Sequence, residues 1–156
     1  MEIRKAEVRD IPGMIELLKQ VGEVHHVIRP DIFRSGALKY NESDLEKILR
    51  DPTRPIFVAA EGDFVAGYCF CVHRQTLNDP VLMDSQELYI DDLCVDDGCR
   101  GQGVAKALYA HTLEYAKQCG CGFLTLNVWH GNDTALRFYE KSGFTPRKTY
   151  MEVKLC

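Results

Sequence analysis

The stretch CRGQGVAKAL, residues 99–108, places two glycines and an arginine within four positions and continues directly into helix-forming residues. Gly101 and Gly103 lack a Cβ, so the backbone can turn tightly there and lie close to a ligand. The helix start behind them leaves several N–H groups without internal partners. Such clustered N–H groups, with Arg100 beside them, favour an anion such as phosphate. The stretch therefore predicts a phosphate-binding loop, and a helix start that only needs a tight turn stays the alternative.

Two other phosphate loops do not fit this spacing. A P-loop needs Lys and then Ser or Thr after its last glycine, but Gly103 is followed by Val104 and Ala105. A dinucleotide-binding fingerprint needs Gly or Ala at position 106, where Lys106 stands, and belongs near the start of a βαβ unit. The usual nucleotide triphosphatase is therefore excluded, and the dinucleotide interpretation is poor.

Composition places the chain among ordinary globular proteins. Its 156 residues are 46% apolar and 27% charged, which predicts one domain over residues 1–156. A net charge of −4 argues against a nucleic-acid partner, because such proteins usually carry a basic face. No apolar run is long enough to span a membrane, and the first residues lack the apolar core of a secretory signal. We therefore expect a cytoplasmic protein without a membrane partner.

The seven cysteines show no spacing typical of a zinc site. Cys69 and Cys71 alternate along a predicted strand, which places both on one face as small core residues. We expect reduced thiols and no metal.

Hydrophobic periodicity predicts a mixed α/β chain. Pro12 suits the first turn of the first helix, Ser43 the start of the second and Asn132 the cap of the last, with Gly143 after its end. Only the fourth and fifth strands are joined by a helical crossover, so these two should run parallel. The predicted strands are 3–6, 56–60, 64–71, 87–95, 123–128 and 150–155, and the predicted helices are 11–21, 43–49, 104–118 and a short one after 132, with an irregular region at 22–51.

Two ordered motifs carry a family resemblance. Residues 93–105, LCVDDGCRGQGVA, resemble the coenzyme A signature of the GNAT N-acetyltransferase superfamily, and N-x-x-A-x-x-F-Y-x-x-x-G-F, residues 132–144, resembles its second motif. Asp97 stands where proline is common and Cys99 where an aromatic residue is common, but neither lies in the glycine core of the loop. The resemblance implies a single-domain GNAT fold: an α/β architecture with a mixed, mostly antiparallel central sheet flanked by helices, whose parallel strands four and five splay apart.

The same resemblance implies acetyl-CoA as cosubstrate, lying where strands four and five part. Its pyrophosphate would bind the amides of the glycine loop, and its pantetheine arm would pair with main-chain groups of the fourth strand. A backbone N–H there would polarise the thioester carbonyl. The cofactor-binding residues expected on this basis are Leu93, Cys94, Val95, Arg100, Gly101, Gln102, Gly103, Val104, Ala105, Asn132 and Tyr139.

The resemblance also implies direct attack of an amine on the thioester in a ternary complex, which requires two proton transfers. Tyr139 matches the family's usual general acid for the departing sulfur. The base candidates are Glu87 and Asp91, because strand alternation places them on one face while Asp92 points the other way. His130, in the loop after the fifth strand, is a third candidate.

The acceptor is expected to be the primary amine of a small cationic molecule, because six acidic residues crowd one segment. Residues 89–92, YIDD, also resemble the equivalent strand of polyamine acetyltransferases. The irregular region 22–51, with His25, His26 and Tyr40, should wall the acceptor site. A peptide or protein amine remains an alternative, as do a longer acyl group and a coenzyme A-binding module without catalysis. Many relatives form homodimers, which the resemblance also allows here. The acidic residues are Asp84, Glu87, Asp91, Asp92, Asp96 and Asp97.

Overall fold

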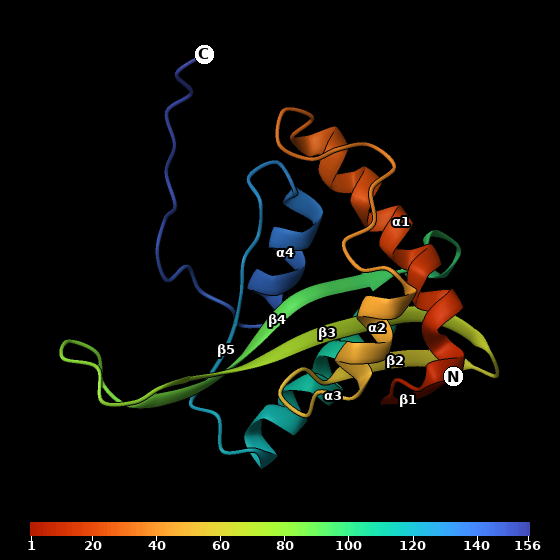
Figure 1. Cartoon of the computed structure of the whole chain (residues 1–156), viewed down its shortest axis with the longest axis horizontal. Coiled ribbons are helices and arrows are strands. Elements are labelled where there is room, and N and C mark those ends of the chain that lie inside the picture. Colours follow the sequence, from red (N-terminus) through yellow and green to blue (C-terminus); the bar gives the residue numbers. More distant parts are fainter.

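The computed structural model describes all 156 residues and contains one five-stranded sheet (Figure 1). Its strands lie side by side in chain order from β1 to β5. All neighbours pair antiparallel except β4 and β5, which run parallel. This confirms the predicted mixed, mostly antiparallel sheet and its parallel pair. The strands are β1 (Glu2–Lys5), β2 (Ile56–Glu61), β3 (Phe64–Thr76), β4 (Ser85–Val95) and β5 (Phe123–Leu126).

Helices cover both faces of this sheet (Figure 1). On one face α1 (Ile11–Ile28) and α2 (Glu42–Leu49) pack against one buried cluster, which includes Tyr68 and Phe70 of β3. On the other face α3 (Val104–Gln118) packs against a second cluster, in which Cys69 and Cys71 fill the core as predicted. The last helix, α4 (Asp133–Lys141), follows β5. None of the helices combines the length and apolar character that crossing a membrane requires.

Several predicted boundaries were wrong, each for an identifiable reason. The first helix continues through Gly22 to Ile28, because tertiary packing outweighs the low helix propensity of one glycine. The second helix is capped by Asn41 and not Ser43: the Asn41 side chain accepts from the Asp44 N–H at 2.8 Å, and the Asp44 carboxylate accepts from the Asn41 N–H in return. The third strand is longer than predicted and the fifth is shorter.

The predicted strand at 150–155 is absent. Residues 145–156 form no helix or strand, and every one of them is exposed. The alternating pattern was real, but no neighbouring strand lies beside it in this chain, and a strand needs a partner for its backbone groups.

A β-bulge interrupts β4 in its second half. Phe70 of β3 pairs with Asp92 and Cys71 pairs with Ile90, so Asp91 is an extra residue without an opposite partner. The bulge shifts the alternation of β4. Leu88 and Ile90, before the bulge, belong to the α3 cluster. Cys94, an even-numbered residue after the bulge, belongs to the α1 and α2 cluster instead. Side chains after the bulge therefore face the opposite side from the one that simple alternation predicts.

Candidate active site

The two parallel strands part in the middle of β4. Pairing between β4 and β5 runs from Glu87 opposite Phe123 to Ile90 opposite Leu126, and there β5 ends. β4 continues to Val95, paired only with β3 on its other side. The main chain of Leu93, Cys94 and Val95 therefore faces no strand on the β5 side. This is the splayed pair expected from the sequence.

The glycine loop lies at the end of β4, before α3. Gly101 and Gly103 have φ values of 75° and 81°, which non-glycine residues rarely adopt. Gly103 is the N-terminal cap residue of α3, and no side chain caps the helix start. A Cβ built on either glycine meets no atom within 4 Å, so the space in front of the loop is open. Uncapped N–H groups at an open helix start fit a phosphate group.

The loop is held by α1 through Gln20, a residue that the sequence did not single out. The Gln20 side-chain amide donates to Asp96 Oδ1 at 2.9 Å, and its oxygen accepts from the Asp97 N–H at 3.1 Å. Asp96 also accepts from the Gly98 N–H at 2.9 Å. Arg100 is exposed and pairs with Asp97 at 3.0 Å. Gln20 and Asp96 thus fix the loop on the side that faces α1, while the N–H groups of Gly101 and Gly103 make no hydrogen bond.

Tyr139 lies in α4 with only 9% of its surface exposed. Its ring packs against Phe138 and Phe144, with centroids 5.2 and 5.5 Å away, while its hydroxyl makes no hydrogen bond in the protein and is reached by solvent. Burial, and to a smaller extent Cys69 and Asp92, raise the pKa of Tyr139 above its ordinary value. The side chain therefore keeps its proton and has a free donor. At the start of the same helix, Asn132 is the predicted cap and accepts from the Ala135 N–H at 3.4 Å.

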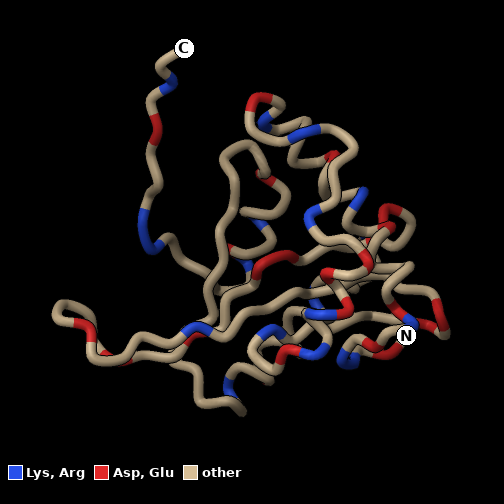
Figure 2. The backbone as a smooth tube through the Cα atoms, in the orientation of Figure 1, with Lys and Arg blue, Asp and Glu red and all other residues tan.

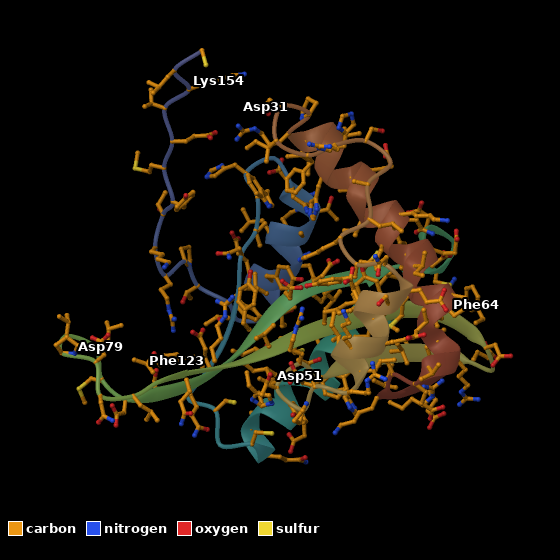
Figure 3. All side chains as sticks on the ribbon, viewed as in Figure 1. Asp31, Asp51, Phe64, Asp79, Phe123 and Lys154 are labelled. Carbon is orange, nitrogen blue, oxygen red and sulfur yellow. The ribbon has the colours of Figure 1, made fainter.

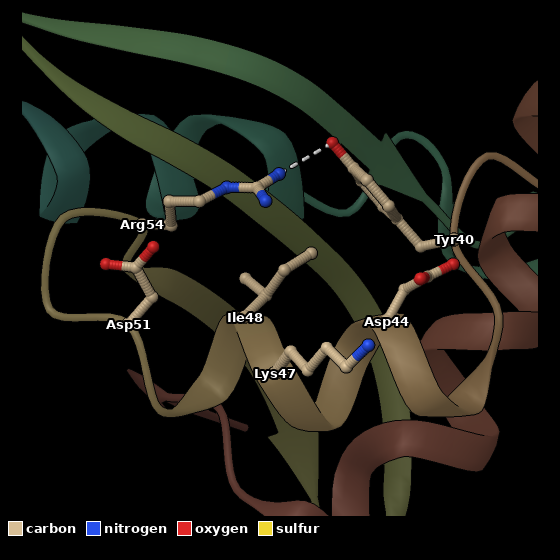
Figure 4. A pocket seen from close by; sticks show the side chains of 6 residues that line it. All are labelled: Tyr40, Asp44, Lys47, Ile48, Asp51 and Arg54. Carbon is tan, nitrogen blue, oxygen red and sulfur yellow. Dashed lines mark hydrogen bonds between the residues drawn. The ribbon is translucent and has the colours of Figure 1, made fainter.

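Asp91, the bulged residue, is held between two groups from the connection between α1 and α2. Its carboxylate accepts from the Tyr40 hydroxyl at 2.8 Å and pairs with the Lys39 ammonium at 3.1 Å. Arg54 donates to the same Tyr40 hydroxyl at 2.9 Å, at the rim of a shallow pocket beside α2 (Figure 4). Burial and the Asp91 carboxylate raise the pKa of Tyr40 to about 12, so it remains a hydrogen-bond donor. The carboxylate of Asp91 thus already binds one cation.

Asp92 does not point away from Asp91, which corrects the prediction. It accepts from the Tyr68 hydroxyl at 2.7 Å, and Tyr68 belongs to the same α1 and α2 face on which Tyr40 stacks over Phe70. The bulge turns both carboxylates to one side, where the second half of β4 forms an acidic stretch in Figure 2. Burial raises the pKa of Asp92 to about 6, although the Tyr68 hydrogen bond opposes the shift.

This raised pKa predicts a pH-dependent effect of Asp92→Asn. Well below its ordinary pKa of 3.8 the Asp92 carboxyl is neutral whether the chain is folded or unfolded, whereas above pH 6 the folded protein must hold a buried charge that the unfolded chain hydrates freely. Wild type thus loses stability as pH rises through this range, and the variant does not. We therefore compare the difference in free energy of unfolding, Asp92→Asn minus wild type, at two pH values. This difference should be about 1 kcal/mol larger at about pH 8 than at about pH 5.

Urea unfolding at both pH values measures this difference. Asp63→Asn, in the exposed turn between β2 and β3, is the matched control and should show no pH-dependent gain. A constant difference between Asp92→Asn and wild type across the two pH values would contradict the raised pKa.

The other base candidates lie away from this point. Glu87 shares a face with Asp91 as predicted, but it accepts from Thr125 at 2.5 Å and lies 3.9 Å from Arg147, where β4 and β5 are still paired. His130 is exposed in the loop after β5 and makes no hydrogen bond. The structure therefore brings Asp91 to the parting strands, and brings neither Glu87 nor His130 beside it.

Aromatic residues join the end of α1 to the loop after β5. The His25 ring stacks on Phe33 at 4.9 Å, and Phe33 meets Trp129 edge-on at 5.0 Å. Burial, and then Lys39, lower the pKa of His25, which favours the neutral ring. His26 bonds to the Phe33 carbonyl at 2.7 Å. Trp129 was not marked by the sequence, because the stretch between β5 and α4 has no pattern that places it. That the region 22–51 walls the acceptor site stays a prediction.

Comparison with known proteins agrees with this geometry. The sequence profile of the acetyltransferase (GNAT) family matches residues 21–144. The chain belongs to the GNAT acetyltransferase family. Among solved structures, this GNAT chain is similar to a mutant of the BH1408 protein from Bacillus halodurans, with 31% identity, full coverage of both chains and a TM-score of 0.95. An aminoglycoside N-acetyltransferase AAC(6')-Iy, solved with CoA, shares the fold at 18% identity, 99 and 100% coverage and a TM-score of 0.73.

Curated relatives of this GNAT chain match over shorter segments. Streptothricin acetyltransferase from Streptomyces lavendulae is 37% identical over 89 residues, which are 57% of this chain and 42% of that enzyme. The peptidyl-lysine N-acetyltransferase YjaB of Escherichia coli is 32% identical over 105 residues, 65% of this chain and 58% of the relative. The GNAT chain thus spans roughly half the length of these two relatives, which act on different acceptors by their names.

Proposed function

We propose that this protein transfers an acetyl group from acetyl-CoA to the primary amine of a small cationic molecule. The observation that carries the proposal is the end of β4–β5 pairing at Ile90, one residue before the bulged Asp91. From that point β4 offers free main chain on one edge, an acidic side chain at the bulge, and the uncapped glycine loop at its end. The free main chain and the glycine loop would bind a thioester carrier, and the acidic side chain would bind an amine acceptor beside it.

The residues of the loop and strand fit the carrier. The N–H groups at the start of α3 are uncapped and would hold the pyrophosphate, while the edge of β4 would pair with the pantetheine arm as an added strand does. Asn132, at the start of α4, would contact the arm as well as capping the helix. The proposed binding residues are those expected from the sequence: Leu93, Cys94, Val95, Arg100, Gly101, Gln102, Gly103, Val104, Ala105, Asn132 and Tyr139.

Two side chains would move the protons. The Asp91 carboxylate binds the acceptor ammonium and takes its proton, directly or through water, so that the free amine attacks the thioester carbon. The C–S bond then breaks, and the Tyr139 hydroxyl donates its proton to the sulfur. The nitrogen, which becomes an amide, gives its second proton back to the Tyr139 phenolate through water, so that no net proton is lost from this side chain. Of the two base candidates in β4, the contacts favour Asp91 over Glu87.

The contact between Lys39 and Asp91 supports a cationic acceptor. The Lys39 ammonium is a primary amine of the chain itself, 3.1 Å from the carboxylate, and its side chain is 47% exposed. An entering ammonium group would take the same place and displace it. Because Lys39 is also a lysine within a peptide, this contact favours a peptidyl lysine as the second candidate acceptor, as in the name of YjaB.

Release of free thiol from acetyl-CoA across a panel of polyamines, aminoglycosides and lysine peptides tests the proposal. Wild type should turn over at least one small cationic amine. Asp91→Asn should lower kcat/KM for that amine about 100-fold, because both a charged contact and a base are lost. Glu87→Gln should change it by less than about threefold, as expected for a residue outside the reacting groups.

Three outcomes separate the candidates. Turnover of lysine peptides alone would replace the small amine by the peptidyl acceptor. A large loss with Glu87→Gln and none with Asp91→Asn would move the base to Glu87. Binding of acetyl-CoA without turnover of any amine would favour a coenzyme A-binding module and reject the enzyme.

A further inference from the structure

One amine of the chain already lies in the place proposed for the acceptor. The Lys39 ammonium is 3.1 Å from the Asp91 carboxylate, and the Asp91 side chain is only 17% exposed. In the other two lysine ion pairs of the chain the carboxylate is more exposed. These pairs are Lys19 with Glu16 on α1, and Lys154 with Asp31 at the top of the molecule in Figure 3. Lys39 is thus the one lysine whose carboxylate partner is mostly enclosed.

The connection between α1 and α2, residues 29–41, fixes the backbone that carries Lys39. Figure 1 shows this connection running back along α1. The Glu23 carboxylate of α1 accepts from the Gly36 N–H at 2.7 Å, and on the other side of Lys39 the Tyr40 ring and hydroxyl are held by the contacts described above. The backbone therefore delivers the Lys39 side chain to the parting strands. Because a lysine stem is flexible, its nitrogen can approach a neighbouring atom without movement of the backbone.

The Lys39 ammonium also lies near the second group that the proposed transfer uses. Burial is the main cause of the raised pKa of Asp92, and the Tyr68 hydrogen bond and then the Lys39 charge oppose it. Burial is also the main cause of the raised pKa of Tyr139, and the Asp92 charge adds to it. One carboxylate is thus within electrostatic reach of both the Lys39 amine and the proposed proton donor.

We propose that Lys39 is itself an acetyl acceptor, so that the protein with acetyl-CoA bound and no other amine present acetylates its own Lys39 Nζ. This inference rests on the proposed function, because it uses the same cosubstrate and the same two proton-transferring side chains. Asp91 takes one proton from the Lys39 ammonium and releases it to water, and the free amine attacks the thioester carbon. The N–C bond forms, the C–S bond breaks, and Tyr139 donates its proton to the sulfur. The second proton of the nitrogen returns to Tyr139 through water, which leaves acetyl-lysine, the thiol of CoA and one released proton.

Acetylation of Lys39 competes with transfer to a free acceptor. Both amines need the Asp91 carboxylate, so a bound acceptor displaces Lys39 and protects it. Once acetylated, Lys39 carries no charge and its ion pair with Asp91 is lost. The chain therefore modifies itself mainly when acetyl-CoA is present and the acceptor is scarce.

Incubation with trideuterated acetyl-CoA, followed by peptide mass spectrometry, tests this reaction. Lys39 should gain label at least about 100-fold faster than Lys19, because a positioned base contributes that much. Lys19 is the matched lysine, since it also pairs with a carboxylate, at 2.9 Å, but on an exposed face of α1. The rate per chain should not depend on protein concentration, because amine and base belong to the same molecule. Saturation with the amine that wild type turns over fastest should suppress labelling of Lys39 and leave that of Lys19 unchanged.

Three variants show where the label goes and what drives it. Lys39→Arg keeps a cation for Asp91 but removes the amine, so total labelling should fall by one acetyl group per chain. Lys19→Arg should leave labelling of Lys39 unchanged. Asp91→Asn should slow labelling of Lys39 to the rate of Lys19, with circular dichroism as the check that the variant is folded. Where it is not folded, protection by the amine and the concentration series still decide.

The outcomes separate this inference from the proposed function. Turnover of a small amine, with Lys39 labelled no faster than Lys19, would overturn the inference and leave the function standing. Equal labelling of Lys39 in wild type and folded Asp91→Asn would also overturn it, because the reaction would then be uncatalysed. A rate per chain that rises with protein concentration would assign the transfer to a second molecule and reject self-acetylation. Fast labelling of Lys39 without turnover of any small amine would support the inference and reject the small acceptor, and neither reaction with acetyl-CoA bound would reject both.

Discussion

Tyr139→Phe should lower kcat by about 100- to 1,000-fold while the affinity for acetyl-CoA stays within about threefold of wild type. The hydroxyl makes no hydrogen bond in the protein, so its removal breaks no contact, and the ring keeps its packing against Phe138 and Phe144. What is lost is the proton that we propose the neutral Tyr139 phenol donates to the departing sulfur. Steady-state thiol release and calorimetric titration with acetyl-CoA measure the two quantities.

The matched control is Tyr109→Phe. Tyr109 belongs to the same aromatic group, 6.4 Å from Phe138 and 5.8 Å from Phe144 between centroids, but its hydroxyl donates to the Ser142 carbonyl at 3.1 Å. This variant should lose some stability and keep its kcat. A kcat for Tyr139→Phe close to that of wild type would mean that another group, or water, protonates the sulfur.

Gly103→Val should weaken coenzyme A binding at least about 100-fold in calorimetry, the second large effect. A β-branched residue strains a φ of 81°, and its side chain would enter the open space in front of the α3 amides, which is where the pyrophosphate would lie. The strain should also lower the free energy of unfolding by about 1 to 3 kcal/mol. Loss of binding must therefore be separated from loss of fold.

Gly120→Val makes that separation. Gly120 follows the other end of α3, its φ is 76°, and a Cβ there also meets nothing within 4 Å. The two variants should lose similar stability, but only Gly103→Val should lose coenzyme A. Equal affinity in both folded variants would place the pyrophosphate away from the glycine loop.

Features written in short stretches of sequence were predicted well. Gly101 and Gly103 in the left-handed region, Asn132 as a helix cap, and the parallel β4 and β5 all follow from local chemistry or from the helix that separates two strands. The family resemblance added the order of these parts. The family resemblance also marked Tyr139. Its hydroxyl makes no hydrogen bond in the structure, and its catalytic role stays a prediction.

Features that depend on distant residues could not be predicted. The bulge at Asp91 is set by the pairing with β3, and it alone turns Asp92 toward Tyr68. The contact of Lys39 with Asp91 joins residues far apart in the chain, in a connection without periodicity. Residues 150–155 show the opposite failure: their alternation predicted a strand, but they form none because no strand of the sheet lies beside them.

The single extra residue in β4 also limits how this protein can change. Leu88 and Ile90 serve one hydrophobic cluster and Cys94 serves the other, so one strand fills the interior on both sides of the sheet. Deleting Asp91 would restore regular pairing with β3 and leave Cys94 on its present face, but it would remove the carboxylate from the point where β4 and β5 part. Homologous chains should therefore tolerate substitutions in this segment far more readily than a change in its length.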